Sequence, residues 1–260
     1  MTMTSPAIRT ALEAHPLYSV PYFTFRPEGS VELADELKGV ILDRRGVDQG
    51  ITVTNRGGWH SAQDLQTWDA PCVVQLVDRI HEFMREVVRH TVADPDDRHL
   101  DGWELEAWAN VNEHGALNLP HVHTRNGNLW SGVLYVDEGE TGDGDHGGRT
   151  RFQDRSGVPK EVLTDRDPFG RELTLQPEQG LFIMFPGTAW HAVDTYTGHR
   201  PRITIAFNLK HPGFAVPTYE PADFWWTNFR FFMRGRQVVA QRVRDRVRSR
   251  RDASGGRRPA

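Results

Sequence analysis

The sequence has 260 residues, 38% of them hydrophobic, with a net charge of −4 and a single cysteine. This composition fits one large domain, and no apolar run is long enough to cross a bilayer, so we expect no membrane partner. The N-terminus lacks a signal-peptide pattern, and the lone Cys72 cannot form an internal disulfide. Both features favour a cytoplasmic protein.

Positive charge gathers at the C-terminal end. From Arg230 onward there are eleven arginines against two aspartates, a local charge of +9. Such a tail could contact nucleic acid, but arginine is this chain's general positive charge and arginine runs alone are not specific. We therefore favour a solvent-facing helix surface and expect no nucleic-acid partner.

Two helices are predicted in the first hundred residues. Apolar residues recur at helical spacing in Glu32–Asp43 and again from about Ala70 to His90. Residues 1 to about 20 lack such a pattern, and Asn55–Ser61 has the composition of a turn. These helices are expected to pack on the outside of whatever follows.

From Trp103 the period changes to two, which indicates strands. Strand candidates separated by Gly, Pro and Asp clusters are Trp103–Asn112, Leu129–Val136, Arg149–Gln153, Arg171–Leu175, Gly180–Phe185, Ala189–Tyr196 and Arg202–Lys210. Many short strands of this kind predict a mainly β sandwich or jelly roll. We expect a single domain with helical support over 1–100, a jelly-roll core over 101–212, and a C-terminal helix and basic tail over 213–260. The aromatic cluster Phe224–Trp226 would begin that helix and could serve a homodimer.

Three histidines are the candidate metal ligands. His121 and His123 point the same way if they lie in a strand, and a jelly roll can bring the strand that holds His191 across from them. Three imidazoles suit a transition metal such as iron, with positions left for a bidentate co-substrate and oxygen. His60, His114, His146 and His199 are expected to be exposed.

Arg202 opens an apolar strand shortly after His191. A buried guanidinium needs an acid, and its planar fork suits a carboxylate. Thr204 shares its strand face and could donate a hydroxyl to the same carboxylate. An internal salt bridge or simple exposure of Arg202 would be the alternatives.

The chain resembles the Fe(II)/2-oxoglutarate-dependent dioxygenase superfamily, and within it a group of 2-oxoglutarate-Fe(II) oxygenases. The resemblance rests on segments in a fixed order that together cover most of the chain: Thr54–Ser61, Trp108–Asn112, His121–His123 with Trp130–Val136, and Phe185–His191 with Arg202–Asn208.

The resemblance implies a double-stranded β-helix (a cupin-like jelly roll), with His121 and His191 as iron ligands and Arg202 on the C5 carboxylate of 2-oxoglutarate. It implies an oxidoreductase that consumes molecular oxygen and 2-oxoglutarate and oxidises, most simply hydroxylates, an unactivated C–H bond of a small molecule, for instance in secondary metabolism. Beyond the metal ligands, no further catalytic residue is predicted.

One position departs from the superfamily pattern, which usually places an acid where this chain has His123. We expect His123 to ligate as a third histidine, with a supporting position as the alternative. Glu113 and Asp137 are the nearest acids that could substitute. Asn110, Asn112, Ser131 and Tyr135 are further candidates for binding the co-substrate.

A three-histidine cupin that does not use 2-oxoglutarate is the competing prediction. Such cupins usually carry a glutamate soon after the histidine pair, whereas Thr124–Asn128 contains no acid. That alternative also leaves Arg202 without a role.

Overall fold

The computed structural model describes residues 20–124, 127–140, 144–153 and 172–214, all within one compact unit that ends at Val216. The predicted C-terminal helix, the basic tail and the candidate dimer surface lie outside these residues. None of the described helices is long and apolar enough to span a membrane.

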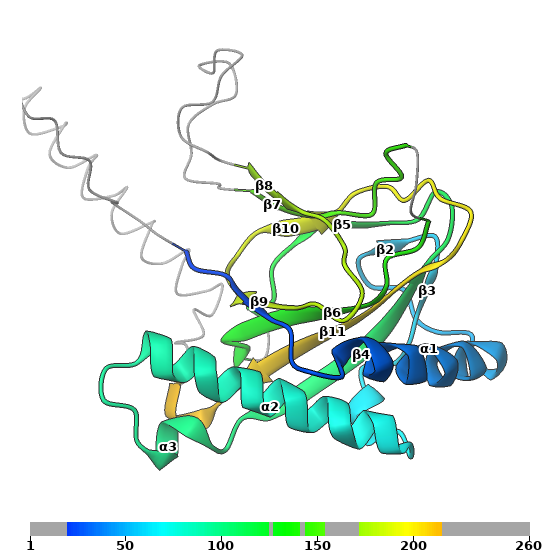
Figure 1. Ribbon diagram of the computed structural model, residues 1–260. Coiled ribbons are helices and arrows are strands. Elements are labelled where there is room, and N and C mark those ends of the chain that lie inside the picture. The colour runs from blue at the N-terminus through cyan, green and yellow to red at the C-terminus, as the bar shows by residue number, and fades with distance from the viewer. Residues whose placement is uncertain (1–19, 125–126, 141–143, 154–171, 215–260) are drawn as a thin grey trace, which may run out of the picture. The chain divides into compact units, whose positions relative to one another are not determined.

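Two long helices lie along the outer face of one sheet (Figure 1). Helix α1 spans Ser30–Val47, α2 spans Pro71–Thr91, and a short α3 spans Asp97–Leu100. A proline in the first turn of α2 suits a helix start, because its missing N–H would have no partner there. The buried faces of α1 and α2 pack on the sheet through Leu33, Leu37, Ile41, Leu76, Ile80, Phe83 and Val87.

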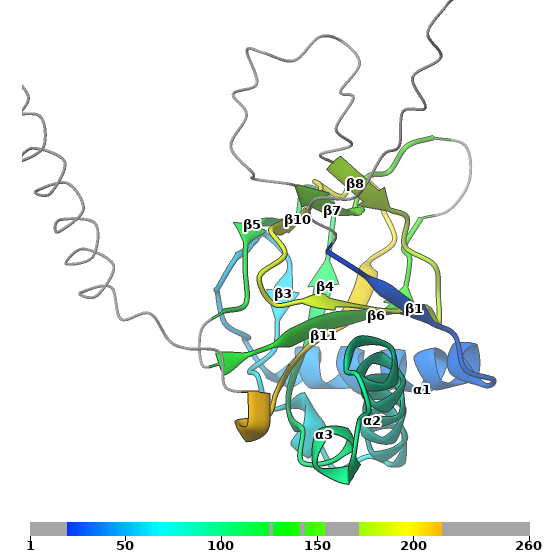
Figure 2. The same cartoon turned by 90° about the vertical axis from the view of Figure 1, so that its left-hand side faces the viewer.

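The strands form two antiparallel sheets that face each other (Figures 1 and 2). The larger sheet has the order β1 (Phe23–Phe25), β9 (Phe182–Pro186), β6 (Trp130–Asp137), β11 (Arg202–Lys210), β4 (Glu104–Asn112) and β3 (Trp59–His60). The smaller has the order β2 (Asn55–Arg56), β5 (Leu117–His121), β10 (His191–Val193), β7 (Thr150–Gln153) and β8 (Glu172–Leu175). Two facing sheets flanked by N-terminal helices confirm the predicted mainly β jelly roll.

Alternation along β11 separates the core from the space between the sheets. Ile203 and Ile205 are buried in the core that includes the helices, whereas Arg202, Thr204 and Asn208 line a cavity on the opposite face. Successive strand residues point to opposite faces, so one strand supplies both surfaces. The site is therefore built on the same strands that anchor the helices.

The sequence missed four short strands. Asn55–Ser61 is not only a turn, because β2 and β3 form there and pair with β5 and β4. Strand β1 lies just beyond the stretch without a pattern, and β5 contains Pro120, which obscured it. Two- and three-residue strands carry too little periodicity to be recognised, so their pairing partners define them.

Candidate metal centre and co-substrate cavity

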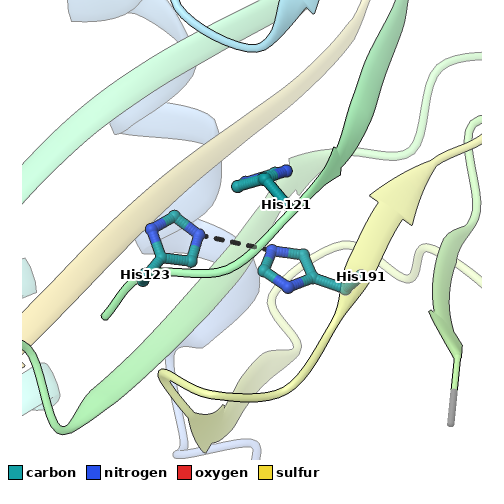
Figure 3. Close-up of side chains that lie close together, drawn as sticks. All are labelled: His121, His123 and His191. Atoms are coloured by element: carbon teal, nitrogen blue, oxygen red, sulfur yellow. Dashed lines mark hydrogen bonds between the residues drawn. The ribbon is translucent and has the colours of Figure 1, made fainter. Parts of the chain in front are cut away.

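The three candidate histidines come together between two strands of the smaller sheet (Figure 3). His121 is the last residue of β5 and is the direct antiparallel partner of His191, the first residue of β10. His123 follows two residues later, and its backbone N–H donates to Gly187 O at 2.8 Å. The turn before β10 thus fixes the backbone of the third histidine.

The ligand atoms of these residues all lie within 4.8 Å of one another. Ring centroids are separated by 4.4 Å for His121 and His191, 4.8 Å for His121 and His123, and 5.1 Å for His123 and His191. His123 Nε2 lies 3.3 Å from His191 Nε2 (Figure 3, dashed line). All three imidazoles therefore converge on one point, as metal coordination requires.

Backbone carbonyls select the tautomer of two of the rings. Leu119 O lies 2.6 Å from His121 Nδ1, and Ala189 O lies 2.9 Å from His191 Nδ1. Because a carbonyl only accepts, each Nδ1 carries the proton and each Nε2 keeps a lone pair. This outer hydrogen bond is typical of metal-binding histidines, which it orients and makes more basic.

Burial keeps the three imidazoles neutral. It lowers the pKa of His123 to about 2, with repulsion from His191 and then His121 adding to the effect. Burial lowers the pKa of His191 to about 3, again helped by His121, and lowers the pKa of His121 as well. Neutral imidazole is the form that binds metals, so the donor set is available at physiological pH.

Within the described residues no carboxylate joins this cluster. Glu113 is exposed and pairs with Arg45. Asp137 is buried elsewhere and pairs with Lys38 at 2.6 Å and Arg200 at 3.1 Å. Neither acid replaces His123, and among the residues that the structure describes no charged side chain joins the three histidines.

Arg202 is buried at the start of β11, with 1% of its surface exposed. Its Nε has no hydrogen-bond partner, and no carboxylate among the described residues pairs with it. Its guanidinium lies 5.6 Å from the centre of the Tyr135 ring, and burial lowers its pKa while Tyr135 and Tyr196 act in the opposite direction. A buried arginine without an acid is costly, so a bound anion would complete the site.

The histidine cluster and Arg202 face one cavity of about 670 Å³ between the sheets. Its size is within the usual range for small-molecule sites. Thr204 and Asn110, which are direct partners across β11 and β4, also face it, and Asn110 Oδ1 is buried without a hydrogen bond. These two candidates lie where a co-substrate on Arg202 could reach them.

The other three candidates do not line the cavity. Asn112 Nδ2 lies 3.5 Å from Asn118 Oδ1, and Ser131 Oγ donates to Asn208 Oδ1 at 2.7 Å. The Tyr135 hydroxyl lies 2.8 Å from Thr150 Oγ1, and Thr150 does face the cavity. These side chains are therefore placed to support residues of the cavity wall.

His60 and Glu106 are among the cavity residues that were not predicted as site residues. His60 was expected to be exposed, but it is 3% exposed, lines the cavity and stacks on Trp108 with ring centroids 5.7 Å apart. Glu106 also faces the cavity. The signal for Glu106 was present, because it alternates with Trp108 and Asn110 on one face of β4.

The comparisons with known proteins agree with this geometry. A family model described as "Putative 2OG-Fe(II) oxygenase" matches residues 106–208, which span the histidines and Arg202. No protein in the curated set matches the sequence.

Solved structures share the fold at low sequence identity. A prolyl-4-hydroxylase from Pseudomonas putida is 17% identical over 74% of this chain and 93% of its own, with a TM-score of 0.54. The α-ketoglutarate-dependent epimerase SnoN from nogalamycin biosynthesis is 12% identical, with coverages of 73% and 78% and a TM-score of 0.51. AviO1 from Streptomyces viridochromogenes Tue57 is 14% identical, with coverages of 75% and 91% and a TM-score of 0.51. The double-stranded β-helix is thus confirmed.

Proposed function

We propose that this chain is a 2OG-Fe(II) oxygenase, as its match to that family over residues 106–208 supports, and that it uses Fe(II) and 2-oxoglutarate to hydroxylate an unactivated C–H bond of a small molecule. In this proposal His121, His123 and His191 hold the iron, and Arg202 and Thr204 bind the distal carboxylate of 2-oxoglutarate. Iron with 2-oxoglutarate and oxygen supplies the oxidising chemistry, and the chain holds the reactants in register.

The observation that carries the proposal is that Arg202 is buried, has no acid partner among the described residues and faces the same cavity as three neutral histidines. A guanidinium in this state favours a carboxylate that arrives with a ligand, since a planar fork can hold both oxygens. Thr204 lies on the same strand face and adds a hydroxyl donor. A cupin that does not use 2-oxoglutarate would leave this charge unexplained.

Charge balance supports ligation by His123. Three neutral imidazoles leave the +2 charge of the iron undiminished, so a dianionic co-substrate would neutralise it. The convergence of His123 Nε2 toward His191 Nε2 gives the third donor a direct path to the same ion. Asn110, whose Oδ1 lacks a hydrogen bond, is proposed to accept one from a group bound beside the metal.

The cavity also supports a small-molecule substrate. Its volume of about 670 Å³ accommodates 2-oxoglutarate together with a metabolite-sized second molecule. SnoN, which shares the fold, is described as acting in nogalamycin biosynthesis. We propose that this chain likewise acts on a small molecule of secondary metabolism.

Anaerobic reconstitution tests the proposal. Apo-protein given Fe(II) and 2-oxoglutarate without oxygen should develop a weak visible charge-transfer band, and admission of oxygen with substrate pools should produce succinate. A folded, iron-loaded protein without that band would contradict the proposal. Iron binding that is indifferent to 2-oxoglutarate would instead favour the cupin alternative.

A further inference from the structure

Glu106 is the carboxylate on the cavity wall at the end away from Arg202. In the ladder of β4 and β11, Arg202 pairs with Asn112 and Asn208 pairs with Glu106. The six steps along the strand from Arg202 to Asn208 span about 20 Å, so Arg202 does not reach this carboxylate. The cavity therefore has a cationic end and an anionic end.

A buried amide holds Glu106 in place. Ser131 Oγ donates to Asn208 Oδ1 at 2.7 Å, and Asn208 Nδ2 donates to Glu106 Oε2 at 3.3 Å. Ser131 and Asn208 are 1% and 3% exposed, so this chain of hydrogen bonds lies within the wall. It supports one carboxylate oxygen and leaves the other without a donor from the described residues.

Glu106 also lacks a cation. Among the described residues no lysine, arginine or histidine forms an ion pair with it, whereas the neighbouring Glu104 pairs with Lys210 at 3.0 Å. The two acids thus differ although they lie on the same strand. Glu104 is exposed and neutralised by a neighbour, while Glu106 is half-buried, faces the cavity and keeps its charge available for a ligand.

Trp108, the next residue on the same face of β4, links Glu106 to the histidine cluster along the cavity wall. The Trp108 ring lies 5.9 Å from the His123 ring and lines the cavity with Glu106. A molecule held by Glu106 would extend along this indole toward the three histidines. A carboxylate and an aromatic side chain on one cavity wall suit an ammonium or guanidinium group.

We propose that Glu106 binds a cationic group of the substrate, an ammonium or a guanidinium, and so presents a C–H bond of a small amine to the metal centre. This inference rests on the proposed function, because it assigns Arg202 to 2-oxoglutarate and leaves Glu106 to the substrate. Removing one partner of such a charge-assisted contact should weaken binding about tenfold or more.

The test uses the full chain loaded with Ni(II) and 2-oxoglutarate, so that binding is measured without turnover. Calorimetric titrations compare matched pairs that differ in a single cationic group: n-hexylamine with n-hexanol, pentylguanidine with pentylurea, and phenethylamine with 2-phenylethanol. At least one cation should bind the natural chain tenfold or more tightly than its neutral partner. Glu106→Gln, which keeps an acceptor for Asn208, should abolish that preference and leave the affinity of the neutral partner unchanged.

Two variants and one measurement keep the result interpretable. Glu104→Gln should retain the preference, and Glu106→Asp should retain part of it because the charge remains. The affinity for 2-oxoglutarate is measured first, since its absence contradicts the proposed function and not the role of Glu106. Absence of any cation preference across the panel, or its persistence in Glu106→Gln, would overturn the inference.

Discussion

His121 and His191 are direct partners in the antiparallel ladder of β5 and β10, although they lie far apart in the chain. Their alignment is therefore set by backbone hydrogen bonds, before any side chain or metal contributes. The carbonyls of Leu119 and Ala189, two residues before each histidine, then fix both rings in the same tautomer. The sheet thus positions His121 and His191, whereas His123 lies just beyond β5 and is held by its backbone hydrogen bond to Gly187 O.

Removing either paired histidine should abolish tight iron binding. His121→Ala and His191→Ala each delete one of three converging donors, so the affinity for Fe(II) should fall by about a hundredfold or more. Competition with a calibrated chelator under argon measures the affinity. His114→Ala is the matched control, since His114 is exposed and bonds Thr197 O. An unchanged affinity in either ligand variant would remove that residue from the metal centre.

The long elements and the candidate ligands were predictable because they carry a strong period or a spaced motif. β11 begins and ends where its alternation predicted, at Arg202 and Lys210. His60 was not recognised because β3 has only two residues, and Glu106 was not recognised because its alternation with Asn110 does not say which face of β4 is covered. Which face of a strand is covered depends on long-range pairing, and a single sequence does not contain that information.

Whether His123 binds the iron decides between two forms of the metal centre, one with three histidine ligands and one with two. If it ligates, His123→Ala should weaken iron binding as strongly as loss of His191, while His123→Asp should retain tight binding by forming the two-histidine, one-carboxylate set of many iron oxygenases. Co(II) spectra of the three proteins report the change in donor type. Iron affinity that survives His123→Ala would place this histidine outside the first ring of ligands.

Arg202→Met should separate stability from co-substrate binding. Because Arg202 is a buried charge with no acid partner in the part of the chain that the structure describes, its replacement by an apolar side chain of similar length should raise the free energy of unfolding, by about 1 kcal/mol or more, when no 2-oxoglutarate is present. The affinity for 2-oxoglutarate should fall by about 2–5 kcal/mol, or more than thirtyfold, with iron binding retained. Denaturant unfolding and anaerobic titration measure the two effects. A destabilised variant that still binds 2-oxoglutarate would show that Arg202 is structural.

Asp137→Asn should reduce stability and leave the metal centre intact. Asp137 is 5% exposed and bonds Lys38 of α1, Arg200 and the backbone N–H of Gly139. Both cations are partly exposed, so solvent screening limits the loss to about 1–2 kcal/mol. Glu113→Gln, on an exposed pair, should change stability by less than about 0.5 kcal/mol. Weakened iron binding in Asp137→Asn at temperatures where it is folded would contradict this assignment.

Gly148→Ala should weaken 2-oxoglutarate binding, although Gly148 does not itself line the cavity. Gly148 has φ +67°, and a Cβ there would lie 2.8 Å from Arg202 Cδ, so the arginine would have to move. Gly115→Ala is a matched control, because Gly115 has φ +84° and an added Cβ would meet nothing within 4 Å. Both variants introduce a similar backbone strain of about 1 kcal/mol, to which Gly148→Ala adds the contact with Arg202, so only Gly148→Ala should also lose co-substrate affinity. Equal 2-oxoglutarate affinities in the two variants would mean that the position of the guanidinium does not control binding of the co-substrate.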